Sequence, residues 1–278
     1  MASPSPQWVL DQQNADVQFW EAYIAYSRGL RKLAAFINWR LASHHFPSVY
    51  RNVGRIICVS ETDRQLTLQI APQALVDVVE NGVDCSYLTP GARLDSHLPR
   101  LLFTGTSAAR NVKALADFVD EVYPRIRAQR PGAELCVAGN FAARAQERFA
   151  DVDGLWFTGA VPDLRPYFDP NDVFIAPFNE THGSKLKVAE AMAMGMAIVA
   201  TPEGAQGMPV MNGCNAIIAN GVDEFADRCC ELLSDEALRR RLGRQARQTA
   251  LERLDWPVLG ERLRQMIDEV QLRERAIR

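Results

Sequence analysis

Two lysines, Lys185 and Lys187, lie where the sequence predicts the start of a short helix. Ser184 is a suitable N-cap and Gly195 a suitable stop, so the expected helix runs from Lys185 to Met194. The free N–H groups and the dipole of a helix start favour Asp or Glu there, whereas this helix begins with positive charge. A phosphate group would supply the missing negative charge. Two surface lysines without a partner are the alternative.

Short apolar runs between residues 101 and 219 alternate, for the most part, with helical patterns. The runs are Leu101–Gly105, Leu135–Gly139, Leu155–Gly159, Val173–Phe178, Ala197–Thr201 and Ala216–Ala219. Such alternation predicts a parallel sheet with helices on both faces, and ligands of such sheets bind at the carboxyl ends of the strands. Gly105, Gly139 and Gly159 each end a strand, either to make the turn or to let a ligand approach.

The regions on either side of this sheet have other patterns. Residues 1–15 are polar and are expected to be loose. Residues 16–46 predict a long helix with aromatic core residues. A strand at Arg55–Ser60, a helix at Glu61–Ile70 capped by Ser60 and a second strand at Val76–Glu80 are expected to follow. Three helices are expected after the sheet: Asp223–Leu233, Asp235–Leu254 and Pro257–Leu272.

The composition limits the compartment and the partners. A net charge of −3 argues against a general surface for nucleic acid or anionic lipid, so a phosphate site must be local. The six cysteines include no Cys-x-x-Cys pair, which argues against zinc and disulfide frameworks and favours a reducing compartment. Neither a signal-peptide pattern nor an apolar run of about 20 residues is evident, so a cytoplasmic protein is expected.

The motifs occur in an order that resembles the group 1, family 4 glycosyltransferases. The matching segments are Asn81–Asp84, Leu102–Gly105, Leu135–Gly139, Phe157–Asp163, Gly183–Gly195 and Ile198–Thr201. The resemblance covers about residues 55–255 and implies the GT-B fold, in which two Rossmann-like domains face a cleft. We therefore expect an α/β protein with a Rossmann-like parallel sheet as its C-terminal, donor-binding domain, plus a partial N-terminal α/β domain.

On this resemblance, residues 96–256 form the nucleotide-sugar-binding domain, and residues 1–95 are a remnant of the acceptor-side domain with its long helix. Residues 257–278 form a helix that packs back toward the N-terminal part. Only two strands are evident before residue 96, so a truncated enzyme with the donor half of the site is expected. Such a chain would bind a nucleotide sugar weakly and transfer poorly or not at all, since positioning of reactants supplies about 7–11 kcal/mol.

The resemblance also implies roles for single residues. Glu190 would hold the ribose hydroxyls, Lys185 and Lys187 the diphosphate, and His182 stands where the family has a glutamate that contacts the donor sugar. The implied catalytic residues are His182, Lys187 and Glu190, and the implied donor-binding residues are Gly105, Arg110, Asn140, Val161, Gly183, Ser184, Lys185, Lys187 and Glu190. As alternatives, Glu190 is a surface residue paired with Lys187, Arg110 is a surface residue at a helix start, and His182 is a loop residue.

The implied reaction transfers a sugar, with retention of configuration, from a nucleotide-diphosphate sugar to a glycan or lipid-linked acceptor. This would be a hexosyl transfer of the kind used in polysaccharide biosynthesis, with basic groups stabilising the departing diphosphate. Neither a cofactor nor a metal is expected, and no Asp-x-Asp motif is evident. Peripheral contact with the inner face of the membrane, through the missing part of the first domain, is compatible with this scheme. The alternatives are a nucleotide-sugar epimerase of the same fold and a non-catalytic nucleotide-sugar-binding module.

Overall fold

The structure is a computed structural model, and it describes residues 8–13, 20–21, 23–24, 27–91, 98–179 and 185–277. The chain divides into two compact units. Most of the first unit is Met1–Asn81 and Leu259–Arg278, and the second unit consists of Gly82–Thr181 and Lys185–Val258. Three of the predicted site residues, His182, Gly183 and Ser184, lie outside the described residues.

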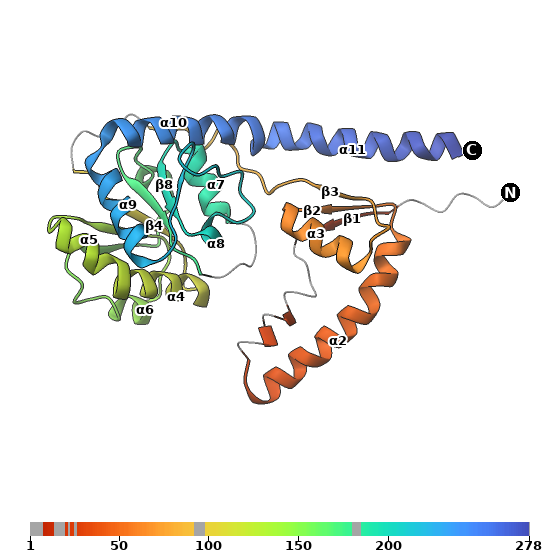
Figure 1. The fold of residues 1–278 in the computed structure, drawn as a ribbon, viewed down its shortest axis with the longest axis horizontal. Coiled ribbons are helices and arrows are strands. Elements are labelled where there is room, and N and C mark those ends of the chain that lie inside the picture. Colours follow the sequence, from red (N-terminus) through yellow and green to blue (C-terminus); the bar gives the residue numbers. More distant parts are fainter. Residues whose placement is uncertain are drawn as a thin grey trace. The chain divides into compact units, whose positions relative to one another are not determined.

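The second unit is built on a six-stranded parallel sheet in the order β6-β5-β4-β7-β8-β9 (Figure 1). Its strands are β4 (Leu101–Thr104), β5 (Leu135–Ala138), β6 (Leu155–Gly159), β7 (Val173–Ala176), β8 (Ala197–Ala200) and β9 (Ile217–Ile218). Every residue of β4, β5, β7 and β8 is buried, as is typical of parallel strands that are covered on both faces. The predicted α/β fold with a parallel sheet is therefore confirmed.

The winding of this sheet reverses between β4 and β7. The chain first proceeds outward from β4 to β5 and β6, and then returns to place β7 on the other side of β4. In such sheets the reversal opens a crevice at the carboxyl ends of the strands, and ligands bind there. The pairing of β4 with β7 is limited to Leu101 with Val173 and Leu102 with Phe174, so the two strands separate toward their carboxyl ends.

Helices lie on both faces of the sheet (Figure 1). They are α4 (Ala109–Asp117), α5 (Tyr123–Gln129), α6 (Ala143–Glu147), α7 (Leu186–Ala193), α8 (Pro202–Ala205), α9 (Val222–Ser234), α10 (Glu236–Arg253) and the first residues of α11 (Trp256–Ile277), with a short 3-10 helix, η2 (Arg165–Tyr167). A π-helical segment, η1 (Phe118–Val122), joins α4 to α5. It comes just before Pro124, whose missing N–H group interrupts regular α-helical bonding.

The first unit has a three-stranded parallel sheet in the order β1-β2-β3, with strands β1 (Val9–Gln12), β2 (Arg55–Cys58) and β3 (Val76–Val78). Its helices include α2 (Gly29–Asn52) and α3 (Glu61–Ile70). The buried core of this unit consists of Tyr50, Ile56, Cys58, Ala71 and Val76. The predicted helix Glu61–Ile70 is confirmed with its Ser60 cap, because the Ser60 hydroxyl accepts a hydrogen bond from the Asp63 backbone N–H at 3.1 Å.

The first strand of this unit corrects the expectation that residues 1–15 are loose. Residues 9–12 form β1, which pairs in parallel with β2 from Val9↔Arg55 to Gln12↔Cys58. The run is short and mixes apolar with polar residues, so its local propensity is weak, and pairing with β2 determines its structure. Among its described residues, the first unit therefore contains one strand more than the sequence indicates.

The long N-terminal helix also differs from its predicted bounds. Among the described residues, 20–21 and 23–24 are helical, and α2 begins anew at Gly29 and continues through Pro47 to Asn52. Gly29 has a positive φ of 56°, a conformation that favours glycine and separates α2 from the preceding residues. Of the aromatic residues assigned to the core, Tyr23 and Phe36 are exposed by 44% and 47%, so the core assignment is wrong for them.

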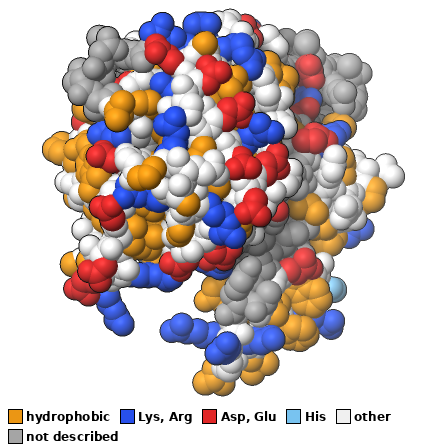
Figure 2. Space-filling view, turned by 60° about the vertical axis from the view of Figure 1, so that its left-hand side comes forward, with side chains coloured by type: hydrophobic (Ala, Val, Ile, Leu, Met, Phe, Trp, Pro, Cys, Tyr) orange, Lys and Arg blue, Asp and Glu red, His pale blue; other side chains and the backbone are white. Residues whose placement is uncertain are grey.

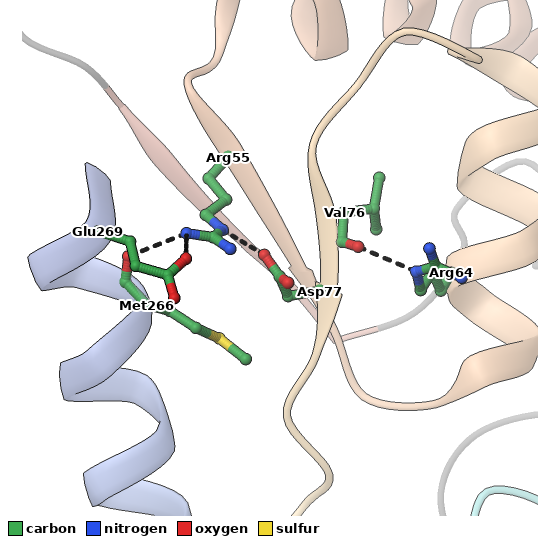
Figure 3. A network of polar contacts seen from close by, with 6 residues as sticks. All are labelled: Arg55, Arg64, Val76, Asp77, Met266 and Glu269. Carbon is green, nitrogen blue, oxygen red and sulfur yellow. Dashed lines mark hydrogen bonds and ion pairs between the residues drawn. The ribbon is translucent and has the colours of Figure 1, made fainter. Parts of the chain in front are cut away.

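Within the first unit, the later part of α11 is tied to β2 (Figure 3). The Arg55 guanidinium donates to Asp77 on β3, to the Met266 carbonyl oxygen at 3.1 Å and to the Glu269 carboxylate at 3.1 Å. The Arg55 side chain is only 11% exposed. A buried guanidinium is stable only when its charge is paired, so this network fixes the helix against the small sheet.

Charge is mixed over the face of the molecule that Figure 2 draws. On the face drawn in Figure 2, acidic and basic side chains alternate, with apolar side chains between them. This mixture agrees with the small net charge of −3. Within the part of the chain that the structure describes, no helix is long and apolar enough to cross a membrane.

Candidate functional site

The start of α7 meets the end of β4 where the winding of the sheet reverses. From the first turn of α7, Lys187 Nζ donates hydrogen bonds to the Thr104 carbonyl oxygen at 2.8 Å and to Asn111 Oδ1 at 2.9 Å. Thr104 is the last residue of β4, and Asn111 lies in the first turn of α4. Two helix starts, each the positive end of a helix dipole, therefore converge on the carboxyl edge of the sheet.

Aromatic rings surround the Lys187 ammonium group. Its Nζ lies 5.1 Å from the centre of the Phe103 ring and 4.7 Å from that of Phe178, and Lys185 Nζ lies 5.4 Å from the Phe178 ring. Both rings are buried. The Thr201 hydroxyl fixes the segment after β7 by donating to the Phe178 carbonyl oxygen. The faces of the rings attract cations and keep water away from them.

Burial makes the charge of Lys187 costly. The pKa of Lys187 is lowered to about 7, mainly by burial. The positive charges of Arg110 and Lys185 lower this pKa further, whereas the negative charge of Glu190 raises it. Burial also raises the pKa of Glu190, against the effect of Lys187. Lys185 is buried and Lys187 is half-buried. Three cations and one carboxylate thus share a partly desolvated cluster, in which an anion interacts strongly.

The loop after β4 is held by the loop after β5. The Gly105 N–H donates to the Ala138 carbonyl oxygen at 3.0 Å, and the Ser107 N–H donates to the Asn140 carbonyl oxygen at 3.1 Å. Gly139 has a φ of +124°, and a Cβ atom there would lie 2.1 Å from the Gly105 carbonyl oxygen. Only glycine fits this close approach, which fixes the backbone next to the strand end that accepts from Lys187.

The other predicted site residues follow the same edge of the sheet. Arg110 is exposed in the first turn of α4, Asn140 is exposed after β5, and Val161 is half-buried after β6. The structure brings Arg110 together with Lys185, Lys187 and Glu190 in one electrostatic cluster. Asn140 and Val161 instead lie at the ends of the neighbouring strands, farther along the edge.

Helix α7 is one residue shorter at each end than the predicted range Lys185–Met194. Its N-cap is Lys185, whose side chain makes no capping hydrogen bond, and no acidic residue lies in its first turn. Gly195 ends the helix as predicted: it has a φ of +68°, and its N–H donates to the Met192 carbonyl oxygen at 3.0 Å. The helix therefore begins with positive charge and no acidic residue.

Asn111 and Phe178 belong to the site but were not among the predicted residues. Asn111 Oδ1 accepts the hydrogen bond from Lys187 of α7. Its spacing from Leu115 puts it on the buried face of α4, and it is 6% exposed. A polar residue on a predicted buried face was the signal that could have identified it. Among the described residues, no group of His, Cys, Asp or Glu side chains could hold a metal ion.

Comparisons with known proteins agree with this arrangement. Residues 98–235 match the family described as glycosyl transferases group 1. An uncharacterized 44.6 kDa protein in the cps region of Klebsiella pneumoniae is 27% identical over 143 residues, which are 48% of this chain and 37% of that protein. The D-inositol 3-phosphate glycosyltransferase of Mycolicibacterium smegmatis is 28% identical over 239 residues, which are 73% of this chain and 53% of that protein. The chain thus spans about half or less of the length of these relatives.

Solved structures show the same fold. A glycosyltransferase from Rickettsia africae has a TM-score of 0.68 at 15% identity, covering 93% of this chain and 80% of its own. HepE from Anabaena, in complex with UDP and glucose, has a TM-score of 0.70 at 15% identity, covering 94% and 71%. Sucrose-phosphate synthase from Thermosynechococcus elongatus has a TM-score of 0.71 at 18% identity, covering 96% and 68%. The chain has the GT-B type of α/β fold that these proteins share.

Proposed function

We infer, from the match of residues 98–235 to the group 1 glycosyltransferases, that the second unit binds a nucleotide-diphosphate sugar and transfers the sugar with retention of configuration. The observation that carries this proposal is the Lys187 ammonium group at the carboxyl end of β4. It lies at the crevice where sheets of this winding bind ligands, in a partly dry cluster with Lys185 and Arg110. A diphosphate has the charge and shape for two converging helix starts and several basic side chains.

Lys187 would act on the leaving group. As the bond between the anomeric carbon and the diphosphate oxygen breaks, negative charge grows on the diphosphate. Positive groups that already point at this charge lower the barrier, because they need no reorganisation during the reaction. The rings of Phe103 and Phe178 exclude water around the ammonium and so strengthen its interaction with phosphate. This mechanism requires neither a metal nor a cofactor.

Glu190 is proposed to bind the ribose. It lies on the same helix as Lys187, three residues later, and its pKa is raised by burial. Two hydroxyl donors would stabilise its buried carboxylate form. Arg110 and Lys185 would add charge for the phosphates, and Gly105 would let a ligand approach the backbone. The role of His182 at the donor sugar rests on the family resemblance alone.

The donor to test first is a UDP-hexose. The HepE neighbour binds UDP and glucose, which supports a uridine nucleotide for this chain as well. The relative in the cps region of Klebsiella supports an acceptor from polysaccharide biosynthesis, either a glycan or a lipid-linked sugar. A lipid-linked acceptor would bring the protein to the inner face of the membrane.

Two alternatives differ in their products. A nucleotide-sugar epimerase would convert a UDP-hexose without an acceptor, and none of the relatives reported above is named as one. A non-catalytic module would bind the nucleotide sugar and leave it unchanged. Product analysis separates the three functions, since only a glycosyltransferase releases UDP while a labelled sugar moves to an acceptor.

Calorimetry with UDP and uridine tests the binding step first. We expect UDP to bind more tightly than uridine, because only UDP reaches the basic cluster. Incubation with radiolabelled UDP-glucose and a panel of oligosaccharide and lipid-linked acceptors then tests transfer of the labelled sugar. Equal affinity for UDP and uridine would contradict the proposed donor site, and accumulation of an epimerised sugar without an acceptor would point to the epimerase.

A further inference from the structure

We propose that Asn111 is a positioning residue, whose neutral side-chain oxygen holds the Lys187 ammonium group at the end of β4 and leaves its charge available to an anion. This inference rests on the proposed function, because it assumes that the anion is the diphosphate of the donor. It concerns a residue of α4 that lies 76 positions from the lysine in the sequence. Asn111 would act through Lys187 and would not need to touch the substrate.

The hydrogen bonds of Lys187 hold its ammonium group through neutral oxygens. An ammonium group has three N–H donors. Two of them are occupied by neutral oxygens, the Thr104 carbonyl at 2.8 Å and Asn111 Oδ1 at 2.9 Å. Among the described residues no further acceptor is present for this group. In its ammonium form Lys187 is therefore held in place by two dipoles and keeps one donor for a ligand.

The side-chain amide of Asn111 is fixed in one orientation. Its Nδ2 donates to the Thr106 carbonyl oxygen at 3.1 Å, and its backbone N–H donates to the Ala108 carbonyl oxygen at 2.8 Å. Turning the amide over would place its NH₂ group against the Lys187 ammonium and its oxygen against a carbonyl, so only one orientation is favourable. Asn111 is 6% exposed, and a Cβ atom on Gly105 would lie 3.2 Å from its amide. Tight packing therefore keeps the oxygen directed at Lys187.

The charges around Lys187 also favour a neutral partner. Lys187 faces Arg110 and Lys185 as cations and Glu190 as the carboxylate, while Thr104, Asn111, Phe103 and Phe178 contribute no net charge. An aspartate at position 111 would have nearly the same shape, but it would form an ion pair with Lys187. That pair would compete with phosphate for the same ammonium group. The amide therefore positions the lysine without neutralising it.

The matching experiment compares Asn111→Asp with wild type in calorimetric titrations of UDP and uridine. We expect UDP affinity to fall about tenfold or more, the scale of one charged hydrogen bond, while uridine affinity stays unchanged. Asn220→Asp adds the same charge at an exposed residue after β9 and serves as the control, with UDP affinity within about twofold of wild type.

Two further readouts separate positioning from a merely structural role. In wild type we expect UDP affinity to fall as the pH rises and Lys187 loses its proton. In Asn111→Asp the new carboxylate favours the ammonium form of Lys187, so this fall should occur at higher pH. The ion pair with Lys187 would stabilise this variant, whereas loss of the Asn111 Nδ2 hydrogen bond to the Thr106 carbonyl oxygen would destabilise it, so its melting temperature without ligand is measured to show that the variant is folded. Wild type that fails to bind UDP would refute the proposed function. If wild type binds UDP, two results would refute only the role of Asn111. One is an Asn111→Asp variant with the UDP affinity of wild type, and the other is a variant that loses uridine affinity in parallel with UDP affinity.

Discussion

Helix α3 begins with Glu61 and Asp63 in its first turn, whereas α7 has no acidic residue there and begins with Lys185 and Lys187. At α3 the Ser60 hydroxyl accepts from the Asp63 N–H at 3.1 Å and donates to the Asp63 carboxylate at 2.6 Å. The start of α3 is thus satisfied by its own residues. The start of α7 has no side-chain cap and gathers positive charge instead.

The difference also affects stability, because the positive charge at the start of α7 is costly when no ligand is bound. The folded pKa of Lys187 is about 7, below the ordinary value of 10.5, so the unfolded chain binds more protons between these values. The free energy of unfolding therefore rises with pH in this window, and the charged lysine destabilises the ligand-free fold below it. An anion that binds at α7 would remove this cost, while α3 needs no ligand.

Reversing the charge at the start of α7 should have the largest effect. Lys187→Glu makes this start resemble that of α3, and we expect UDP affinity to fall on the order of 100-fold, from a lost charged hydrogen bond and new repulsion. Lys113→Glu makes the same change on the exposed side of α4, where Lys113 pairs with Asp117, and should leave UDP affinity within about twofold. If calorimetry finds similar losses for both variants, the effect is one of overall charge and not of this site.

The affinity for UDP should fall as the pH rises above about 7, the pKa of Lys187 in the ligand-free protein. Above that value the lysine is neutral before binding, so a bound diphosphate must recruit a proton, and affinity drops by up to about tenfold per pH unit. Below it the ammonium is already present and Lys187 adds no slope. Titrations between pH 6.5 and 8.5, in buffers of different ionisation enthalpy, measure the proton uptake. Absence of proton uptake at pH 8 would be inconsistent with a ligand on Lys187.

Glu190→Gln should reduce affinity for UDP more than for its 2′,3′-dideoxy analogue. A carboxylate that accepts from two ribose hydroxyls makes charged hydrogen bonds that the dideoxy compound cannot form, with an expected difference of about tenfold. Calorimetry on both ligands provides the comparison. Equal losses for the two ligands would mean that Glu190 serves the packing of α7 and not the ribose.

Ser60→Ala should affect stability alone, and to a smaller degree. Loss of the cap at α3 should lower the free energy of unfolding of the first unit by about 1 kcal/mol, which chemical denaturation can measure. UDP affinity should stay the same, because this cap belongs to a different unit from the basic cluster. A change in UDP affinity larger than the change in stability would contradict the claim that the start of α3 serves stability alone.

Local signals allowed the sequence to predict much of this picture. The Ser60 cap and the Gly195 stop act within a few residues, so their helix ends are predictable from spacing and residue type. The alternation of buried runs predicted the parallel sheet of the second unit, because strands covered on both faces must be apolar throughout. Lys185 and Lys187 stood out since their charge contradicts the preference of a helix start.

Other features depend on contacts that spacing does not encode. Lys187 meets Thr104 and Asn111 across 83 and 76 positions of sequence, so the partner of the lysine is visible only when β4, α4 and α7 are assembled. The strand β1 was missed because its four residues are stabilised by pairing with β2 and carry little strand signal of their own. The helix α2 begins at Gly29, whose positive φ is a backbone feature that side-chain periodicity does not reveal.

The most direct test of the account compares UDP with UMP on wild type and on Lys187→Met. Both ligands share base and ribose, so the ratio of their affinities reports the contribution of the second phosphate. We expect wild type to prefer UDP by about tenfold or more, and Lys187→Met to bring the two affinities within about threefold of each other. A UDP preference that is unchanged in Lys187→Met, in a variant whose melting temperature shows it to be folded, would contradict the claim that the start of α7 binds the diphosphate.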